Sequence, residues 1–360
     1  MMFSKKNLIA LLSSAFVLSS FSAYAAEEPI KVEGYVDSYI SFDNDSAIKF
    51  DDSKDKKRTT NNKGTNAIGH RKNEFNINLA QVTLSKNADW YRGRFTLSYG
   101  TAPLQSWPME YFPVQEANAG IKLCDGVWLD AGVFLTHIGL ESLLPKNNHQ
   151  SILSMTTMNE PFYQNGVKLS YKPMEQLELQ LHALNGLGIM EDSNNDKSLG
   201  WLVSWSPNAN FNLTDSGYVG NDEQAGAAAN YTVFENLNFT YQPLDALSIK
   251  GSLDAAFKSK TMSDLYLSAL LSLKYSFNKN FAVSLRGETT MDDKKVLTYG
   301  MNGVGATLGL EYKPTDNSYV RLEGRQLMMS DKDPNKIFLG ADGKPSSSRM
   351  EGVLSMGVSF

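Results

Sequence analysis

The feature that most constrains this chain is an alternation of apolar and polar residues with a period of two, repeated along nearly its whole length. Between Leu247 and Phe257, for example, the odd-numbered residues are apolar or glycine, whereas the even-numbered ones include Ser248, Lys250 and Asp254. Successive side chains of a β-strand point to opposite faces, whereas a helix places apolar residues three and four apart. The alternation therefore predicts strands with one apolar and one polar face.

About sixteen segments show this pattern, each near the length that a tilted strand needs to cross the apolar layer of a membrane. The least regular pair contains Asp215 and Glu235 on the apolar phase, so fourteen strands is the alternative count. The phase also slips near Ala80 and Gln81, which predicts a β-bulge there. The predicted strands are residues 30–42, 73–86, 90–101, 117–123, 127–136, 162–172, 177–185, 198–206, 211–220, 230–241, 247–257, 264–275, 281–289, 303–313, 318–326 and 350–360.

The connections between these segments alternate strictly between short and long. A soluble β-sandwich has no reason to sort its loops in this way, whereas outer-membrane barrels have short periplasmic turns and long external loops. The sequence therefore predicts an all-β fold, a transmembrane antiparallel up-and-down β-barrel. The short connections, rich in the Pro, Asn, Asp and Gly of tight turns, are residues 87–89, 124–126, 173–176, 207–210, 243–246, 278–280 and 314–317, and long ones include 43–72, 137–161 and 327–349.

Aromatic residues lie close to the short turns, as expected for a belt of rings at a membrane interface. The chain also ends on an amphipathic strand with Phe360 as its last residue. Such a terminal aromatic resembles the signal read by the barrel-assembly machinery, which is therefore an expected partner. The predicted periplasmic belt is Trp90, Tyr171, Trp205, Phe211, Tyr241, Tyr275, Phe281, Tyr312, Tyr319 and Phe360, and the predicted outer belt is Phe42, Phe75, Tyr99, Tyr163 and Phe257.

The first residues predict a secretory signal peptide. Lys5 and Lys6 precede a short apolar stretch that reaches about Leu18, and an Ala-x-Ala sequence ends at Ala25. A membrane anchor is the alternative, but the apolar stretch is too short to span a bilayer. We therefore expect removal of residues 1–25, and residues 26–360 are expected to form one barrel domain in contact with outer-membrane lipid.

Composition excludes two classes of protein. A single cysteine, Cys124, cannot form an internal disulfide, so the chain is not a disulfide-stapled secreted scaffold. The 34 basic residues include Lys5 and Lys6, so the mature chain has 32 basic against 39 acidic residues, a net charge of −7. This balance argues against nucleic acid as a partner.

If the apolar phase faces lipid, the opposite phase lines the inside of the barrel and carries many charges. Charges in such number are tolerated only in water, and a barrel of about sixteen strands is too wide for its side chains to fill. An aqueous pore is therefore predicted. The predicted pore-lining residues are Arg92, Arg94, Lys122, Asp130, Lys168, Lys250, Asp254, Lys274, Arg286, Glu288, Glu311, Arg321, Glu323 and Arg325.

Two features of this interior have alternative interpretations. The arginines among the pore-lining residues form either a basic ladder that favours anions or ion pairs with carboxylates on neighbouring strands. The connection 137–161 has apolar patches at Leu140–Leu144 and Ile152–Leu153 that a solvated loop would not need. We expect this connection either to fold into the barrel and narrow it, or to pack against neighbouring loops.

No sequence motif for catalysis, a cofactor or a metal ion is found. His70, His137, His149 and His182 form no metal-binding pair, and neither a Gly-x-Ser-x-Gly sequence nor a glycine-rich phosphate loop occurs. His137 with Glu141, at the rim of the barrel, is the only pairing that suits a catalytic site. We therefore predict no enzyme activity, no cofactor and no metal site.

Several segments resemble the OmpL-like β-barrel porin family. The resemblance lies in residues 73–86 (NEFNINLAQVTLSK), 128–134 with 137–141, 161–171, 184–186 and 320–325. It covers most of the mature chain and implies an outer-membrane porin without catalytic residues.

The leading expectation is an outer-membrane porin whose water-filled channel admits small hydrophilic solutes by passive diffusion. A homotrimer is one expected assembly, because many porins form trimers. Two alternatives remain from other classes: a barrel scaffold whose surface loops bind other molecules or mediate adhesion, and an outer-membrane enzyme. The charges predicted inside the barrel favour the channel.

Overall fold

A computed structural model of the chain describes residues 28–44, 71–192, 194–297, 302–330, 338–339 and 344–360. The predicted signal peptide (1–25) lies outside the described residues. So do most of the connection 43–72, including His70, and part of 327–349. Among the described residues, no helix is long and apolar enough to span a membrane.

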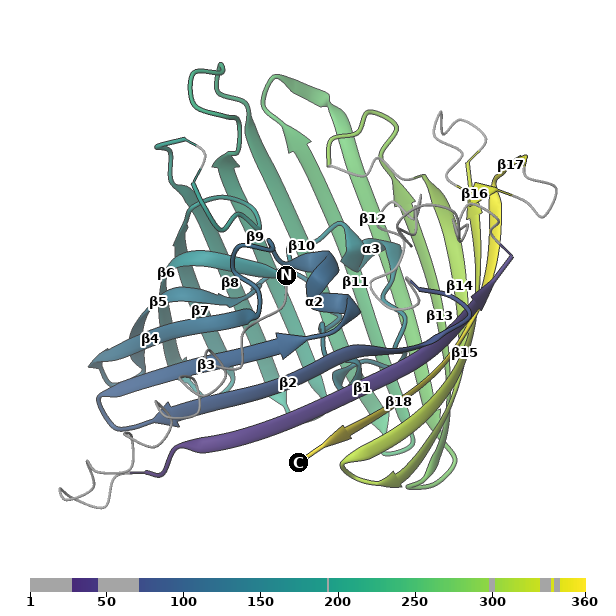
Figure 1. Cartoon of the computed structure of the whole chain (residues 1–360). Helices are drawn as coiled ribbons and strands as arrows, with labels where there is room; N and C mark the ends of the chain where they lie inside the picture. The colour runs from purple at the N-terminus through teal and green to yellow at the C-terminus, as the bar shows by residue number, and fades with distance from the viewer. Residues whose placement is uncertain (1–27, 45–70, 193, 298–301, 331–337, 340–343) are drawn as a thin grey trace, which may run out of the picture.

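Sixteen antiparallel strands close into a barrel (Figure 1), which confirms the predicted fold class and strand count. Each strand pairs with its neighbours in sequence, and the first pairs with the last. Every predicted strand is present. The strands are β1 (Lys31–Asp43), β2 (Phe75–Asn87), β3 (Tyr91–Tyr99), β4 (Val114–Cys124), β5 (Val127–Leu135), β6 (Tyr163–Met174), β7 (Leu177–Leu184), β8 (Ser198–Asn208), β9 (Phe211–Asn221), β10 (Tyr231–Leu244), β11 (Leu247–Lys258), β12 (Thr261–Ser276), β13 (Phe281–Met291), β14 (Gly303–Thr315), β15 (Ser318–Met329) and β18 (Ser348–Ser359).

Short elements lie in three of the connections. Helix α2 (Thr101–Ser106) follows β3, and a 3-10 turn, η2 (Pro145–Asn147), and helix α3 (Met155–Met158) lie between β5 and β6. The strands β16 (Phe338–Leu339) and β17 (Pro345–Ser346) pair with each other between β15 and β18. The sequence alternation predicts none of these elements, because each is too short to show a period.

The two faces of the barrel wall separate as the alternation predicts. On β13, Phe281 and Leu285 are exposed on the outer face, whereas Ser284, Arg286 and Glu288 are buried on the inner one. A closed ladder leaves no unpaired strand edge, so an apolar outer face of this kind suits contact with lipid. The inner face is where the charged residues gather.

The predicted rhythm of connections is confirmed at all seven short turns but is wrong at one of the others. Between β11 and β12 only two residues, Ser259 and Lys260, leave the ladder, because Lys258 pairs with Thr261. β12 begins three residues before its predicted start, so the connection expected to be long is a tight turn.

Local irregularities lie close to their predicted positions. The bulge falls at Asn78, which has no partner between the pairs Asp37–Leu79 and Ser38–Ile77, two residues before the predicted site. Asp215 and Glu235 share the outward phase of β9 and β10 with apolar residues such as Leu237, which lies opposite Asp215. The two residues lie diagonally across the β9–β10 ladder, so that one carboxyl group, when protonated, can donate a hydrogen bond to the other.

The predicted aromatic belts are correct except at two tyrosines. Tyr319 shares the inner phase of β15 with Arg321 and is buried against Tyr35, 2.9 Å between the two hydroxyl oxygens. Tyr163 is buried under the β3–β4 connection, where its ring centroid lies 5.1 Å from that of Trp107. Proximity to a turn therefore did not distinguish the inner from the outer phase at Tyr319, and it did not reveal the loop that covers Tyr163.

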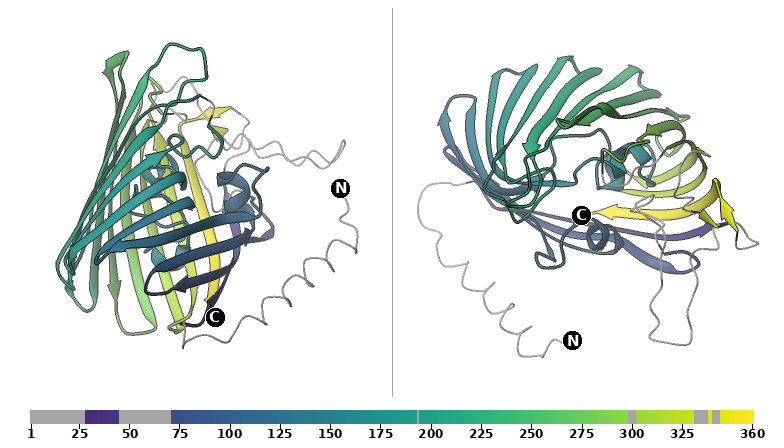
Figure 2. Two further views of the ribbon diagram at one scale, coloured as in Figure 1. Left: turned by 90° about the vertical axis from the view of Figure 1, so that its left-hand side faces the viewer. Right: turned by 90° about the horizontal axis from the view of Figure 1, so that it is seen from above.

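The connection between β5 and β6, residues 136–162, runs inside the ring of strands, as the view from above in Figure 2 shows. We call it the inward loop. It leaves one side of the barrel and reaches the inner faces of β11–β15 and β18 on the other side. Of the two expectations for this loop, the one in which it enters the barrel is therefore correct.

Candidate functional site

Carboxylates on the barrel wall bind the backbone of the inward loop. Glu323 on β15 accepts hydrogen bonds from the backbone N–H groups of Ser151, at 2.5 Å, and Ile152, at 2.9 Å. Glu288 on β13 accepts one from the N–H of Met155 at 2.5 Å. A loop inside a protein must find partners for its backbone polar groups, and these buried acids supply them.

Arginines on the same wall bind the loop carbonyls. Arg321 donates to the carbonyl oxygens of Pro145, at 2.8 Å, and Asn148, at 2.9 Å. Arg286 forms an ion pair of 2.7 Å with Glu141 of the inward loop, and both side chains are almost fully buried. The inward loop is thus fixed at both of its short elements by charged groups from β13 and β15.

The five arginines of the proposed basic ladder all pair with carboxylates. Two lie on β3 and three on β13 and β15, so they form two separate groups rather than one ladder. This arrangement favours the ion-pair interpretation. The pairs are Arg92–Asp130, Arg94–Glu116 at 2.7 Å, Arg286–Glu141 at 2.7 Å, Arg321–Glu311 at 2.7 Å and Arg325–Glu288 at 2.9 Å.

Burial divides the fourteen predicted pore-lining residues into two sets. All five carboxylates are buried, whereas the half-buried residues are all cations. The buried set is Asp130, Asp254, Arg286, Glu288, Glu311, Arg321, Glu323 and Arg325, and the half-buried set is Arg92, Arg94, Lys122, Lys168, Lys250 and Lys274.

The half-buried lysines differ in their partners. Lys122 lies beside the β4–β5 turn and pairs with Asp125 at 2.7 Å. Lys274 pairs with Glu311 at 2.5 Å, and Lys250 donates to the carbonyl oxygen of Asn147 at 2.9 Å. Lys168 stands apart from these, because its ammonium lies 5.0 Å from the centre of the Phe134 ring.

Polar cavities lie inside the barrel between the described residues. The upper cavity, about 400 Å³, is bounded by the inward loop and the inner faces of β6–β10. The lower cavity, about 570 Å³, lies toward the short turns and is lined by Arg92, Asp130, Lys172 and Glu178 among others. A third, also about 570 Å³, lies near Lys146 and the inner faces of β14 and β15.

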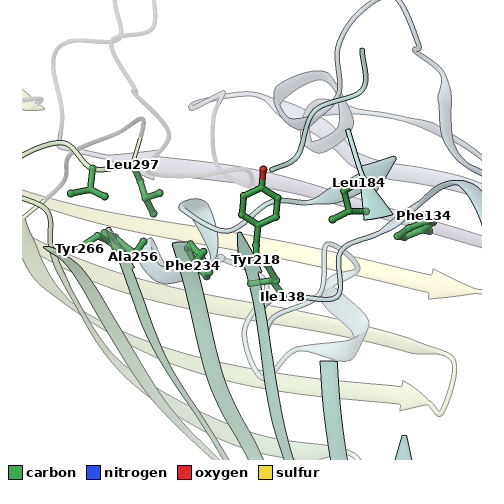
Figure 3. Close-up of a cluster of buried hydrophobic side chains, with 9 residues drawn as sticks. Phe134, Ile138, Leu184, Tyr218, Phe234, Ala256, Tyr266 and Leu297 are labelled. Atoms are coloured by element: carbon green, nitrogen blue, oxygen red, sulfur yellow. The ribbon is translucent and has the colours of Figure 1, made fainter. Parts of the chain in front are cut away.

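An apolar cluster on the inner wall was not predicted. It combines Ile138 of the inward loop with the strand residues Tyr218, Phe234 and Tyr266, all buried. Figure 3 shows Tyr218, Phe234, Ala256 and Tyr266 side by side, one on each of the successive strands β9–β12. These aromatics lie on the inner phase toward the long-loop ends of their strands. Rings on an otherwise polar phase were the sequence signal that an inner element would cover them.

The proposed pairing of His137 with Glu141 is not formed. Nε2 of His137 lies 3.1 Å from the carbonyl oxygen of Gly217, while Glu141 pairs with Arg286. Burial lowers the pKa of His137 to about 4, so the ring is neutral at pH 7. Among the described residues, no group of three His, Cys, Asp or Glu side chains is placed to hold a metal ion.

Glu160, near the end of the inward loop, faces another acid. Burial raises the pKa of Glu160 well above its ordinary value, and the charges of Asp254 and Glu141 raise it further. Within the described part of the chain, Oε1 of Glu160 and Oδ2 of Asp254 are buried without a hydrogen-bond donor. The raised pKa makes Glu160 the protonated member of the pair, which can donate a hydrogen bond to Asp254 on β11.

The family model described as "Putative beta-barrel porin-2, OmpL-like" matches residues 29–360, nearly the whole chain. The chain belongs to this family. It is accordingly a porin, and its place is the bacterial outer membrane. No curated protein sequence matches the porin.

Solved porin structures share its fold. An anion-selective porin from Comamonas acidovorans aligns with a TM-score of 0.58 at 10% identity, over 92% of this chain and 99% of that one. The channel DcaP of Acinetobacter baumannii gives 0.57 at 10% identity, over 94% and 99%. The trimer form of OmpT, an outer membrane protein of Vibrio cholerae, gives 0.56 at 11% identity, over 92% and 99%. At these identities the likeness concerns the fold alone.

The ion pair between Arg286 and Glu141 predicts a large effect on stability. Replacement of Arg286 by Met leaves Glu141 buried without its counter-charge, which costs about 3–5 kcal/mol of unfolding free energy. Urea unfolding of the refolded porin in lipid vesicles measures this loss. In the control, Lys31→Met removes an exposed ion pair with Glu33, worth about 0–1 kcal/mol. Equal losses in the two variants would show that the inward loop does not depend on this pair.

Glu160 predicts a pH dependence of stability. Because its folded-state pKa lies above the ordinary 4.5, the folded state binds more protons than the unfolded state above that pH. Its contribution to stability is therefore complete below pH 4.5 and declines as pH rises toward the folded-state pKa. Glu160→Gln should flatten this decline in unfolding midpoints measured across the pH range. Glu175→Gln, at an exposed carboxylate in the β6–β7 turn, should keep the wild-type slope; an unchanged slope in Glu160→Gln is the contrary result.

Proposed function

We propose that this porin is a passive channel for small hydrophilic solutes, narrowed by the inward loop. The observation that carries the proposal is a pair of polar cavities that share Lys168, about 400 Å³ beside the inward loop and about 570 Å³ toward the short turns. Half-buried charged side chains line them, and only water can solvate such charges at low cost. Small solutes would pass through the space that the loop leaves open.

The fourteen predicted pore-lining residues take two roles in this proposal. The half-buried cations, such as Arg92 and Lys168, line the water-filled passage. Buried residues such as Glu288 and Glu323 hold the inward loop, whereas the buried Asp130 holds Arg92 at the wall of the lower cavity. We infer no catalytic role, since His137 and Glu141 have separate partners. Binding by the external loops is the alternative function.

We further propose three features of its biogenesis and assembly. Residues 1–25 act as a cleaved export signal, and the exposed terminal Phe360 serves the assembly machinery. The porin forms a homotrimer, which the trimer form of the similarly folded Vibrio cholerae protein supports. The outward-facing Asp215 and Glu235 also support contact with a second copy of the porin, because carboxyl groups are unfavourable in contact with lipid.

Single-channel recording tests the channel. Refolded mature porin in a planar bilayer should give stable open steps, because the cavities hold water beside the inward loop. A correctly folded barrel that never conducts would overturn the proposal and move the function to the external loops. Uptake of small sugars by vesicles that contain the porin provides an independent readout of the same passage.

Shortening the inward loop should widen the channel. Deletion of residues 146–158 removes the segment that contacts Glu288, Arg321 and Glu323, and single-channel conductance should rise. The variant must first show a heat-dependent shift on gels, as folded barrels do. If folded deletion variants conduct as wild type does, the inward loop is not what limits the passage.

A further inference from the structure

Lys168 does not form an ion pair with the carboxylate that lies directly opposite it in the sheet. It lies directly opposite Asp130 on β5 and His182 on β7. Arg92 binds both carboxylate oxygens of Asp130, with 2.6 Å between Nε and Oδ1. Within the part of the chain that the structure describes, no carboxylate lies in ion-pair distance of Lys168, and its ammonium rests over the Phe134 ring.

The same lysine lies where the two cavities meet. Lys168 lines both the upper and the lower cavity, and no other residue lines both. Its side chain is half-buried, so its charge reaches the water of each cavity. A solute that crosses from one cavity to the other therefore passes this ammonium.

The other charges beside the upper cavity are compensated. Glu141 pairs with Arg286, and Glu160 shares its hydrogen bond with Asp254, which accepts a further hydrogen bond from Asn236 at 2.5 Å. In the lower cavity Arg92 is bound to Asp130, Lys31 pairs with Glu33 at 2.9 Å, and Lys172 and Glu178 add one charge of each sign. An anion at the junction therefore lies beside the ammonium of Lys168, the charged group that lines both cavities.

The apolar walls of the upper cavity favour the apolar part of an organic solute. Phe134, Ile138, Leu140, Phe162 and Leu202 line it beside Lys168. A hydrated inorganic ion gains nothing from such walls, whereas the apolar part of an organic molecule loses unfavourable contact with water there. The volume, about 400 Å³, suits a small molecule.

From this geometry we propose that Lys168 binds the carboxylate of small organic monoanions at the junction of the two cavities and selects them for passage. The apolar part of the solute lies against the walls of the upper cavity while the carboxylate faces the ammonium. This inference rests on the proposed function, because it assigns a solute class to the same passage.

Benzoate is a suitable probe, since it carries one carboxylate on an apolar ring. Added to one side of a bilayer in KCl, it should reduce the current through wild-type channels and through Lys168→Arg. In Lys168→Gln the concentration for half-block should rise about fivefold, the effect of one unit charge at about 4 Å in water. In the same variant, the reversal potential under a KCl gradient should shift toward the equilibrium potential of K⁺.

Lys279→Gln is the matched control, because Lys279 is exposed in the β12–β13 turn and lines none of the three cavities. It should keep the wild-type block. Equal block in wild type and Lys168→Gln would overturn the role of Lys168, and a chloride effect without benzoate block would overturn the preference for organic anions. A wild-type barrel that never conducts would instead overturn the proposed function.

Discussion

The closed ladder of backbone hydrogen bonds is the constraint on which the rest of the structure depends. In the apolar layer of a membrane no water satisfies a free N–H or C=O, so a sheet that crosses it must have no open edge. β1 and β18 complete the ring, where the N–H of Gly34 donates to the carbonyl oxygen of Phe360 at 2.7 Å. Closure over sixteen strands leaves an interior too wide for strand side chains alone to fill.

The inward loop and the charged barrel wall supply hydrogen-bond partners to each other. Buried carboxylates such as Glu288 and Glu323 would be costly without partners, and so would the free backbone groups of a loop inside the ring. Together they form short hydrogen bonds, with 2.5 Å between Glu288 and the N–H of Met155. The charges on β13 and β15 therefore fix the inward loop in place.

Sequence alone predicted the wall of the barrel and only part of its contents. Strand phase and turns could be read because each depends on residues adjacent in the chain, as Ser284, Arg286 and Glu288 on β13 show. The position of the inward loop could not, because its contacts join residues more than a hundred positions apart, such as Arg286 and Glu141. Tyr319 combines both situations. Its strand phase in the sequence indicates the inner face, where it is buried, but its nearness to a turn led to the wrong assignment to the aromatic belt at the membrane interface.

The charge offered to a solute depends on a competition that composition does not reveal. Asp130 has Lys168 directly across the ladder, and a strand register alone would pair them. The guanidinium of Arg92 presents two N–H groups in a plane and binds both carboxylate oxygens, which a single ammonium does not match. Arg92 also stacks on Trp128, 4.5 Å from the ring centre, which holds it in this pose. Arg92 is thereby neutralised by Asp130, and Lys168 is left without that carboxylate as an ion-pair partner.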